Sequence, residues 1–514
     1  MSIDYIDISL TPENAFNREA IESELNKLTP LKSKTFTVVK RSIDARSRQI
    51  VYRLRVAVHQ KNENPFGKLT SPDIKNVTSG TVIVIIGAGP AGLFAALQAI
   101  EKGLKPVVFE RGKNVRERRR DLAAIHKKHL VNPESNYCFG EGGAGTYSDG
   151  KLYTRSKKRG SVLKVLETLV KFGASTDILI DAHPHIGTNK LPGIIENIRN
   201  YIQACGGEVH FNSKLTDIEV KKGKIRSITI NETKIEAKNV ILATGHSARD
   251  IFELLYNKKI LIESKPFALG VRIEHPQKII DRTQYKCEEK GDILPPAAYS
   301  LVAQVNGRGV YSFCMCPGGI IAPCATKQEE VVTNGWSPSK RNNPYANSGI
   351  VTEIRPEDYN RNQNSGPLSA MKFQSEIEQK CWNSAGKTQH VPAQRMIDFI
   401  EQKKSADLPQ SSYQPGVVSV NLWDALPHFV CEALAGGLKE FGSKMKGYLT
   451  NDAVLHAPES RTSSPVRIPR DKETLQHPEV EGLFPCGEGA GYAGGIVSAA
   501  IDGINCVEKT ILST

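Results

Sequence analysis

The chain has 514 residues, which is long enough for two or three domains with a sizeable core. Its 39% hydrophobic and 24% charged residues, with 42 Gly and 28 Pro, exclude collagen-like, disordered and disulfide-scaffold proteins. The net charge of +13 is patchy, because eight Lys or Arg residues meet only two acidic residues between Arg111 and His129. This distribution favours bound phosphate groups over a wholly basic nucleic-acid surface.

The ten cysteines are scattered along the sequence, several of them inside apolar runs, which indicates reduced thiols and a cytoplasmic location. Cys314, Cys316 and Cys324 come closest to a ligand cluster, but no fourth Cys or His follows at zinc spacing, so we expect no metal site. The first 20 residues have no basic start and no apolar core, so we expect no signal peptide. The longest apolar run, Val82 to Ile100, is interrupted by Gly and Pro, and we expect no membrane span.

Residues 1–75 are expected to form a small α+β domain and a linker. Helical spacing around Asn17 to Leu28 is followed by two β-rich runs, Thr35 to Lys40 and Ile50 to Val58. The segment Gln60 to Lys75 is polar, contains Pro and Gly, and is typical of a linker. The shift in composition marks the first domain boundary.

A β-α-β unit then opens an α/β domain. It comprises a strand at Val82 to Ile86, a Gly-rich turn, a helix at Ala91 to Lys102 and a second strand at Pro106 to Glu110. We expect the first part of this domain to cover residues 76–260.

An inserted substrate domain is expected over residues 261–475. The sequence alternates in β fashion from Phe267 to Ile354, with many Gly, Pro and Asn residues, which predicts an antiparallel sheet. Helical patterns recur at Leu368 to Trp382 and at Asp424 to Phe441. Residues 476–514 return to a strand, a Gly-rich turn and a helix, which completes the α/β domain.

The first Gly-rich turn carries the dinucleotide-binding fingerprint Gly87-Ala88-Gly89-Pro90-Ala91-Gly92. Gly87 permits the tight turn, Gly89 lets the backbone approach a pyrophosphate, and Gly92 lets the helix pack close to the strand. Glu110, at the end of the next strand, would accept hydrogen bonds from the adenosine ribose, and Arg111 is assigned to the same cofactor site. The alternative interpretation is a chance Gly-rich turn.

Two later segments resemble elements of the glutathione-reductase-like flavoprotein superfold. Leu483 to Ile496 resembles its second FAD motif, and Val240 to Gly245 resembles its strand with a Thr-Gly end. The resemblance implies that an acidic residue binds the ribityl chain and that the next helix points at the isoalloxazine, where positive potential would favour negative charge on reduced flavin. The implied contacts are Ala243, Thr244, Gly245, Gly487, Glu488, Gly494, Gly495 and Ile496.

Longer motifs resemble a bacterial family of uncharacterised FAD-dependent dehydrogenases. They are Ser42 to Arg46, Phe139 to Lys151, Gly245 to Asp250, Phe267 to Pro276, Cys316 to Gly319, Asn334 to Ser337 and Glu459 to Arg467. The resemblance implies an FAD-dependent oxidoreductase of the α/β class, with a Rossmann-like FAD-binding domain, an inserted domain built on a mixed antiparallel sheet, and a small N-terminal α+β domain. Trp336 stands where we expect Met in the family.

The sequence lacks two features of pyridine-nucleotide disulfide reductases, namely a second dinucleotide fingerprint and a redox Cys pair after the first helix. NADH or NADPH would therefore dock only transiently, as an electron donor. Flavin N5 is expected to exchange a hydride with a small organic substrate.

Candidate catalytic residues come from polar positions in these motifs. The loop from Gly142 to Lys151 is predicted to line the pyrophosphate and the flavin edge through Gly142, Gly143 and Ala144, with a surface turn as the alternative. Lys151 is a candidate partner for flavin N1 and O2 or for a substrate anion, with an exposed lysine as the alternative.

Arg272 and Glu274 alternate along a β run, so their side chains should share a face and clamp an acidic substrate, or else form a structural ion pair. Arg461 lies beside hydroxyl residues and is a candidate anion or flavin-edge contact, with a solvated loop as the alternative. His246 is a candidate general acid or a helix cap. The basic run Arg116 to Arg120 is expected on the exposed face of a helix.

Two other functions stay open. Residues 1–75 hold 13 Lys or Arg against 9 Asp or Glu, which leaves a flavin-dependent RNA-modifying or RNA-binding protein as the alternative, although a nucleic-acid partner is not our expectation. A flavin-bound structural or redox-sensing module without turnover is the third.

Overall fold

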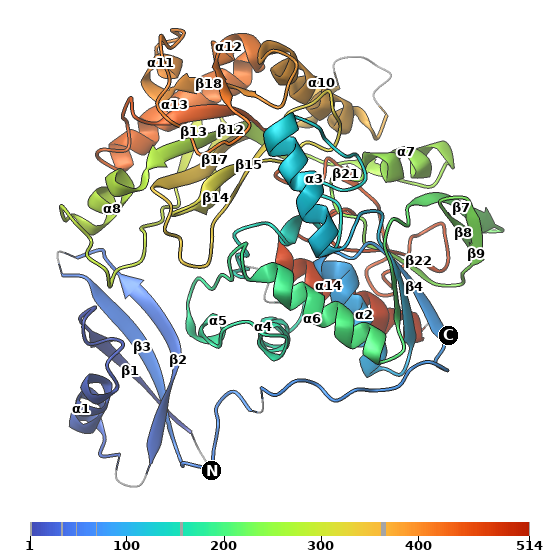
Figure 1. Cartoon of the computed structure of the whole chain (residues 1–514), viewed down its shortest axis with the longest axis horizontal. Helices are drawn as coiled ribbons and strands as arrows, with labels where there is room; N and C mark the ends of the chain where they lie inside the picture. Colours follow the sequence, from blue (N-terminus) through green and yellow to red (C-terminus); the bar gives the residue numbers. More distant parts are fainter. Residues whose placement is uncertain are drawn as a thin grey trace.

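The computed structural model describes residues 3–31, 34–47, 49–67, 69–154, 158–360 and 366–512. Figure 1 shows three regions: an N-terminal unit at the lower left, a region around a parallel sheet at the right, and a large mixed sheet at the top. No helix of the described residues combines the length and apolar character needed to cross a membrane.

The N-terminal unit is a three-stranded antiparallel sheet, in the order β1-β3-β2, with one helix. Its elements are β1 (Asp4–Leu10), α1 (Arg18–Leu28), β2 (Thr35–Asp44) and β3 (Val51–His59). Helix α1 begins where predicted because the Asn17 side chain accepts hydrogen bonds from the backbone amides of Glu19 and Ala20. Strand β1 lies outside the prediction, since most of its side chains are exposed and its apolar alternation is weak.

Five parallel strands form the centre of the second region, in the order β22-β10-β4-β5-β6. They are β4 (Val82–Ile86), β5 (Lys105–Phe109), β6 (Glu208–His210), β10 (Val240–Leu242) and β22 (Leu483–Pro485). Their short apolar runs are typical of a parallel sheet that is covered on both faces. Strand β22 comes from the far end of the chain and pairs with β10, so the predicted return to the α/β sheet is confirmed.

Helices cover one face of the parallel sheet, and a small antiparallel sheet with one helix covers the other. The helices of the first face are α2 (Pro90–Glu101), α4 (Val162–Lys171), α5 (Asp177–Ile180), α6 (Leu191–Ala204) and α14 (Ile496–Leu512). The second face carries β7 (Leu215–Lys221), β8 (Lys224–Ile230), β9 (Thr233–Glu236) and α7 (Arg249–Asn257). Helix α3 (Val115–Lys128) lies between the parallel sheet and the mixed sheet (Figure 1). A short 3-10 helix, η1 (Gly143–Gly145), follows it in the chain.

The third region is a seven-stranded mixed sheet in the order β13-β14-β17-β12-β20-β18-β19. Its strands are β12 (Phe267–Pro276), β13 (Val302–Val305), β14 (Arg308–Cys316), β17 (Tyr345–Ile354), β18 (Val391–Arg395), β19 (Val417–Ser419) and β20 (Val454–Glu459). All pairs are antiparallel except β18 with β19, which confirms the mixed antiparallel character expected here. Two small ribbons accompany it, β11 (Glu263–Ser264) with β21 (Val466–Arg467), and β15 (Ile320–Pro323) with β16 (Thr333–Trp336).

The helices of this region are α8 (Gln277–Tyr285), α9 (Pro356–Tyr359), α10 (Ser369–Ser384), α11 (Met396–Ile400), α12 (Leu422–Ala425) and α13 (His428–Lys444). The helix expected from Asp424 to Phe441 is in fact two, because Leu426 is extended before Pro427 and ends α12. Helix α13 packs across β12, β13, β14 and β17.

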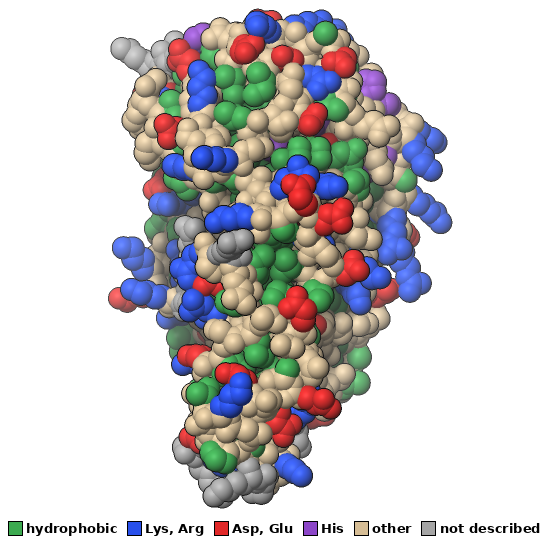
Figure 2. Space-filling view, turned by 90° about the vertical axis from the view of Figure 1, so that its left-hand side faces the viewer, with side chains coloured by type: hydrophobic (Ala, Val, Ile, Leu, Met, Phe, Trp, Pro, Cys, Tyr) green, Lys and Arg blue, Asp and Glu red, His purple; other side chains and the backbone are tan. Residues whose placement is uncertain are grey.

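The prediction that the basic run Arg116 to Arg120 lies on an exposed helix face is wrong for Arg118. This side chain is fully buried within α3, while Arg116 stays exposed. Elsewhere charges are mixed: Figure 2 shows basic and acidic side chains interspersed over the face that carries the N-terminal unit.

Candidate active site

A cavity of about 300 Å³ lies where the carboxyl ends of the parallel strands meet the mixed sheet, the usual place for ligands of open α/β sheets. Most residues assigned to the cofactor border it; these are Gly87, Gly89, Pro90, Ala91, Glu110, Arg111, Gly143, Ala144, Ala243, Thr244, Gly245, Glu488, Gly494, Gly495 and Ile496. Gly92, Gly142 and Gly487, which were also assigned to the cofactor, are not among the residues that line the cavity.

The first Gly-rich turn has the local geometry that the fingerprint predicts. Gly87 has φ +103 and passes so close to Ala243 that a side chain would clash with the Ala243 carbonyl. A side chain on Gly92 would clash with the carbonyl of Gly87. At Gly89, by contrast, the nearest atom to an added methyl is the Gly143 Cα at 3.9 Å. The open side of Gly89 and the uncapped N-terminus of α2 leave room and amide donors for a pyrophosphate.

Glu110 is held by backbone amides rather than left free for the ribose. Its carboxylate accepts hydrogen bonds from the amides of Ala88 at 2.8 Å, Gly112 at 2.9 Å and Gly140 at 2.9 Å. A carboxylate has about four acceptor positions, so one remains for a ligand hydroxyl. Glu110 therefore fixes the two loops of this end of the cavity as well as bordering it.

Arg111 also borders the cavity, with its charge already balanced. Its guanidinium bonds Glu134 at 2.6 Å and Asp250 at 2.9 Å, and it lies 4.3 Å from the centre of the Phe139 ring. Arg111 therefore lines the cavity with a guanidinium group whose charge is balanced by two carboxylates.

Arg118 supports the next loop from behind. Its guanidinium donates hydrogen bonds to the carbonyls of Asn136 at 2.8 Å, Tyr137 at 3.0 Å and Glu141 at 2.9 Å. The loop is further fixed because the Gly142 amide donates to the Ala88 carbonyl at 2.8 Å. Gly143 and Ala144, which follow, line the cavity as expected.

The second Gly-rich segment brings Glu488 and the N-terminus of α14 to the same cavity. Gly494, Gly495 and Ile496 border it directly before the helix, which places the helix's amide donors there. His246 Nδ1 lies 3.4 Å from a Glu488 carboxylate oxygen. His246 does not cap α7, whose first turn has no side-chain cap, so it belongs to the cavity wall.

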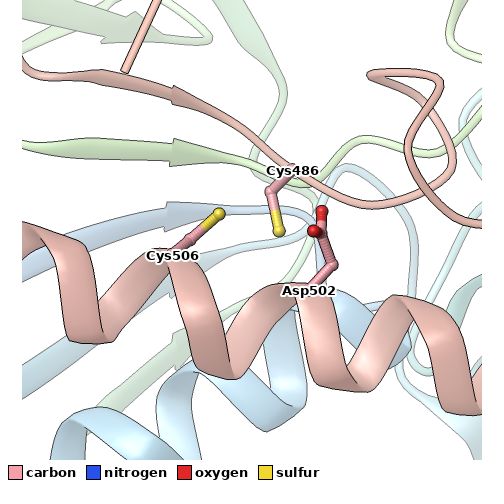
Figure 3. A group of neighbouring side chains, drawn as sticks. All are labelled: Cys486, Asp502 and Cys506. Atoms are coloured by element: carbon pink, nitrogen blue, oxygen red, sulfur yellow. The ribbon is translucent and has the colours of Figure 1, made fainter. Parts of the chain in front are cut away.

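Asp502 holds this segment in place. The Gly487 amide donates to Asp502 at 2.7 Å, and Arg470 binds both carboxylate oxygens. Figure 3 shows the Asp502 carboxylate pointing toward the sulfur of Cys486, with Cys506 beside it. These three groups lie within 4.8 Å of one another, but Asp502 is already neutralised by Arg470, so the trio is a poor cation site.

Lys151 borders the cavity. Its side chain is 34% exposed, and Nζ lies 3.3 Å from Cys316 Sγ and 3.6 Å from Asp149. Burial lowers the pKa of Lys151, but its anionic and thiol neighbours, Cys316 and Asp149, raise the pKa more, so the net shift is upward. The ammonium therefore stays charged.

The expected clamp between Arg272 and Glu274 is not formed. Arg272 is fully buried and pairs with Glu459 at 2.8 and 3.0 Å, while Glu274 accepts hydrogen bonds from the amide and hydroxyl of Ser412. Both faces of β12 are covered, so a shared face does not bring the two side chains to a common ligand. Neither side chain borders the cavity. Arg272 instead contacts the side chain of Asn334, which does.

Arg461 borders the cavity, but its guanidinium is tied into a buried cluster. It bonds Glu330 at 2.5 Å, Glu378 at 3.1 Å and Thr326 at 2.9 Å. Arg249 binds the same two glutamates, at 3.1 and 2.8 Å. Two arginines and two carboxylates thus join α7 to the mixed-sheet region, and the alternative of a solvated loop for Arg461 is wrong.

Several residues of the wall were not assigned to the site from sequence, and three of them come from the mixed-sheet region. Phe313, Cys314 and Asn334 border the cavity from β14 and β16. Asn334 belongs to a motif named from the sequence and Cys314 was considered only as a metal ligand, because β alternation does not tell which face of a fully covered sheet meets a cavity.

The described residues fit FAD: two glycine turns open enough for a pyrophosphate, two helix N-termini, and Glu110 and Glu488 for hydroxyl groups. Bound there, FAD supplies two-electron hydride chemistry. The chain's part is to hold the cofactor and to present Lys151, Cys314, Asn334 and Thr462 from the facing wall.

Comparisons with known proteins agree with this site. A family model described as "Pyridine nucleotide-disulphide oxidoreductase" matches residues 81–255, one described as "FAD-dependent protein, C-terminal domain-like" matches residues 266–462, and a domain of unknown function matches residues 2–59. Among solved structures, CtdE in complex with FAD is 12% identical, with 83% of this chain and 82% of that chain covered and a TM-score of 0.32. A glycine oxidase from Bacillus cereus is 12% identical, with 84% and 96% covered and a TM-score of 0.29. Similarity at this level carries no argument about function.

A curated relative covers most of the chain. An "Uncharacterized protein" of Clostridium beijerinckii is 42% identical over 493 residues, which is 92% of this chain and 92% of the relative. Together with the two FAD-related family matches and the cavity geometry, this relative shows that the chain belongs to the same family as the Clostridium beijerinckii protein and is an FAD-dependent oxidoreductase.

Proposed function

We propose that this oxidoreductase acts on a small organic molecule with an anionic oxygen, which Lys151 binds. The observation that carries the proposal is the position of the Lys151 ammonium in the cavity wall. Asp149 is shared between Lys151 and Arg341, at 3.6 and 2.8 Å, so two cations face one carboxylate. The surplus positive charge attracts an anionic group of the substrate.

The facing wall adds the polar groups that would orient this molecule. The Asn334 side chain borders the cavity and contacts Arg272, which is itself fixed by Glu459. Thr462 also borders the cavity, and its hydroxyl donates to the Ala268 carbonyl at 2.8 Å. Held by buried partners, these groups would bind one orientation of the substrate rather than adapt to many.

We also propose an electron donor, domain boundaries and a cellular location for this protein. NADH or NADPH would be a transient electron donor, because the sequence holds a single dinucleotide fingerprint. Domain boundaries at residues 1–75, 76–260 with 476–514, and 261–475 are supported by the sheets, since each sheet lies entirely within one of these three parts. A cytoplasmic location is supported by the ten free cysteines, because thiols stay reduced in that compartment.

The test is anaerobic stopped-flow reduction and reoxidation of the FAD-loaded protein with NADH, NADPH and a panel of keto acids, enoates, amino acids and uncharged carbonyl compounds. We expect anionic compounds to react, and Lys151→Met to raise their KM at least 10-fold while FAD stays bound. Lys164→Met, which changes an exposed lysine paired with Glu101, is the matched control. Reaction only with uncharged compounds, or an unchanged KM in Lys151→Met, would contradict the proposal.

A further inference from the structure

The wall that faces the FAD-binding turns carries an accessible thiol. Cys314 is exposed and borders the cavity, whereas the next two residues, Met315 and Cys316, are only 7% and 1% exposed. Cys314 thus stands between half-buried and buried residues of β14, and its exposed surface borders the cavity. Lys151, the proposed substrate-binding cation, borders the same cavity and lies 3.3 Å from Cys316 Sγ.

A β-bulge sets the direction of this side chain. Strand β14 pairs with β17 through Phe313 with Gly349 and then Cys316 with Asn347, so β14 has one extra residue between the two pairs. Cys314 has φ +45, a region that residues other than Gly rarely adopt. Bulges next to active sites commonly re-aim a side chain, and this one turns Cys314 toward the cavity.

The backbone of Cys314 is held from behind. Its carbonyl accepts hydrogen bonds from Arg272 at 3.4 Å and from the Cys316 thiol at 3.2 Å. Arg272 is fixed in turn by Glu459 and Asn347. Arg272 therefore does not line the cavity but positions two residues that do, Cys314 and Asn334.

The thiol is suited to proton transfer. Cys314 is open to the cavity, but the protein around the cavity desolvates its thiol, which raises the pKa of Cys314 to about 11 against the lowering effect of Lys151. The thiol therefore keeps its proton at neutral pH. A protonated thiol is a poor nucleophile, which disfavours adduct or disulfide chemistry, but it can give its proton to a strong base formed beside it.

We propose, resting on the proposed function, that Cys314 is the proton donor to the substrate that Lys151 binds. When a polarised double bond of the substrate is reduced, one of its atoms receives the hydride and the other becomes basic. The Cys314 S–H bond breaks, the proton bonds to the basic atom, and the electron pair stays on sulfur. Water then returns a proton to the thiolate.

The first test needs no substrate. Iodoacetamide at mildly alkaline pH should label Cys314 in the apoprotein and label it at least 10-fold more slowly with FAD bound, as read by peptide mass spectrometry. Cys287, a partly exposed cysteine that does not border the cavity, should react equally in both forms. Equal labelling of Cys314 with and without FAD would overturn the placement.

The second test separates the half-reactions of the FAD-loaded protein. Cys314→Ala should slow reoxidation by the substrate by about 100-fold or more, the usual contribution of a general acid, while FAD affinity and reduction by the donor stay unchanged. Cys314→Ser should recover part of the rate, and Cys287→Ser should match the wild type. Alkaline titration to about pH 11 should give the wild type, but not Cys314→Ser, a long-wavelength flavin band from the thiolate.

These outcomes distinguish two failures. If the wild type turns over and Cys314→Ala is equally fast, the inference on Cys314 fails and the proposed function stands. If the wild type reacts with no anionic compound, the proposed function fails, while FAD protection and the alkaline band still report on the thiol. Superimposable spectra of the wild type and Cys314→Ser throughout the titration would overturn the inference directly.

Discussion

Arg470 and Asp502 form a bidentate ion pair directly behind the turn that carries Glu488 into the cavity. The two Nη–Oδ distances are 2.6 and 2.9 Å, and the side chains are only 7% and 4% exposed. The Gly487 amide donates to the same carboxylate, and the Arg470 guanidinium lies 3.9 Å from the centre of the Tyr492 ring. One buried pair thus fixes both ends of the loop between β22 and α14.

Asp502→Asn should therefore weaken folding and FAD binding together. The substitution leaves the Arg470 charge buried without its partner, which costs about 3–5 kcal/mol in comparable pairs. We expect a lower free energy of unfolding in urea and at least a 10-fold higher Kd for FAD in a fluorescence titration. Glu101→Gln, in the exposed pair with Lys164, should change stability by less than about 1 kcal/mol. An Asp502→Asn protein as stable and as flavin-rich as the wild type would show that the pair does not fix the turn.

The glycine turn that begins at Gly87 can be recognised from sequence because the residues that determine its shape are neighbours in the chain. Gly87 and Gly89 are recognisable since a strand, a tight turn and a helix follow within a few residues, and the turn alone dictates where a side chain is tolerated. Glu488 was assigned instead from the resemblance of its segment to a second FAD motif. The element order of the α/β region followed from the same short-range signals.

Partners distant in sequence were not predictable. Alternation along β12 predicted that Arg272 and Glu274 share a face, but the carboxylate that Arg272 binds comes from Glu459, 187 positions later. In the sequence Arg118 cannot be distinguished from Arg116, Arg119 and Arg120, and only the loop at residues 136–141 supplies the three carbonyls that bind it. The bulge that exposes Cys314 depends on pairing with β17, which no window of the sequence around Cys314 contains.

Gly89 and Gly87 should respond differently to the same substitution. A methyl group on Gly89 meets nothing closer than 3.9 Å in the protein, so Gly89→Ala should fold with the stability of the wild-type apoprotein. The methyl group would nevertheless occupy the space next to the α2 N-terminus where a pyrophosphate binds, and the Kd for FAD should rise at least 100-fold. Isothermal titration of the apoproteins with FAD measures this.

Gly87→Ala is the matched comparison, because it combines a clash with the Ala243 carbonyl and a φ of +103. It should lower the thermal midpoint of the apoprotein itself. If Gly89→Ala bound FAD normally, the pyrophosphate would have to lie elsewhere.

His456 should make stability fall in mild acid. The ring is fully buried behind the wall, with Nδ1 donating to the Arg272 carbonyl at 3.2 Å and Nε2 accepting from the Ser411 hydroxyl at 2.8 Å. Burial lowers the pKa of His456 to about 4, below the value of about 6.5 in the unfolded chain. The unfolded state therefore takes up the proton first, and stability that is present above pH 6.5 is lost as the pH falls toward 4. The loss reaches about 3 kcal/mol, from about 2.5 pH units at 1.36 kcal/mol each.

His456→Asn should remove this pH dependence, because an amide keeps polar contacts without titrating in that range. Urea unfolding of the apoprotein at pH 7, 5.5 and 4.5 compares the two proteins, and the wild type should lose more stability than the variant across the series. His210→Asn serves as the control, since that histidine is exposed, pairs with Glu208 and stacks on the Phe109 ring. Equal slopes for the wild type and His456→Asn would mean that the ring is already protonated in the folded protein, and that the Ser411 hydroxyl then accepts from it instead of donating.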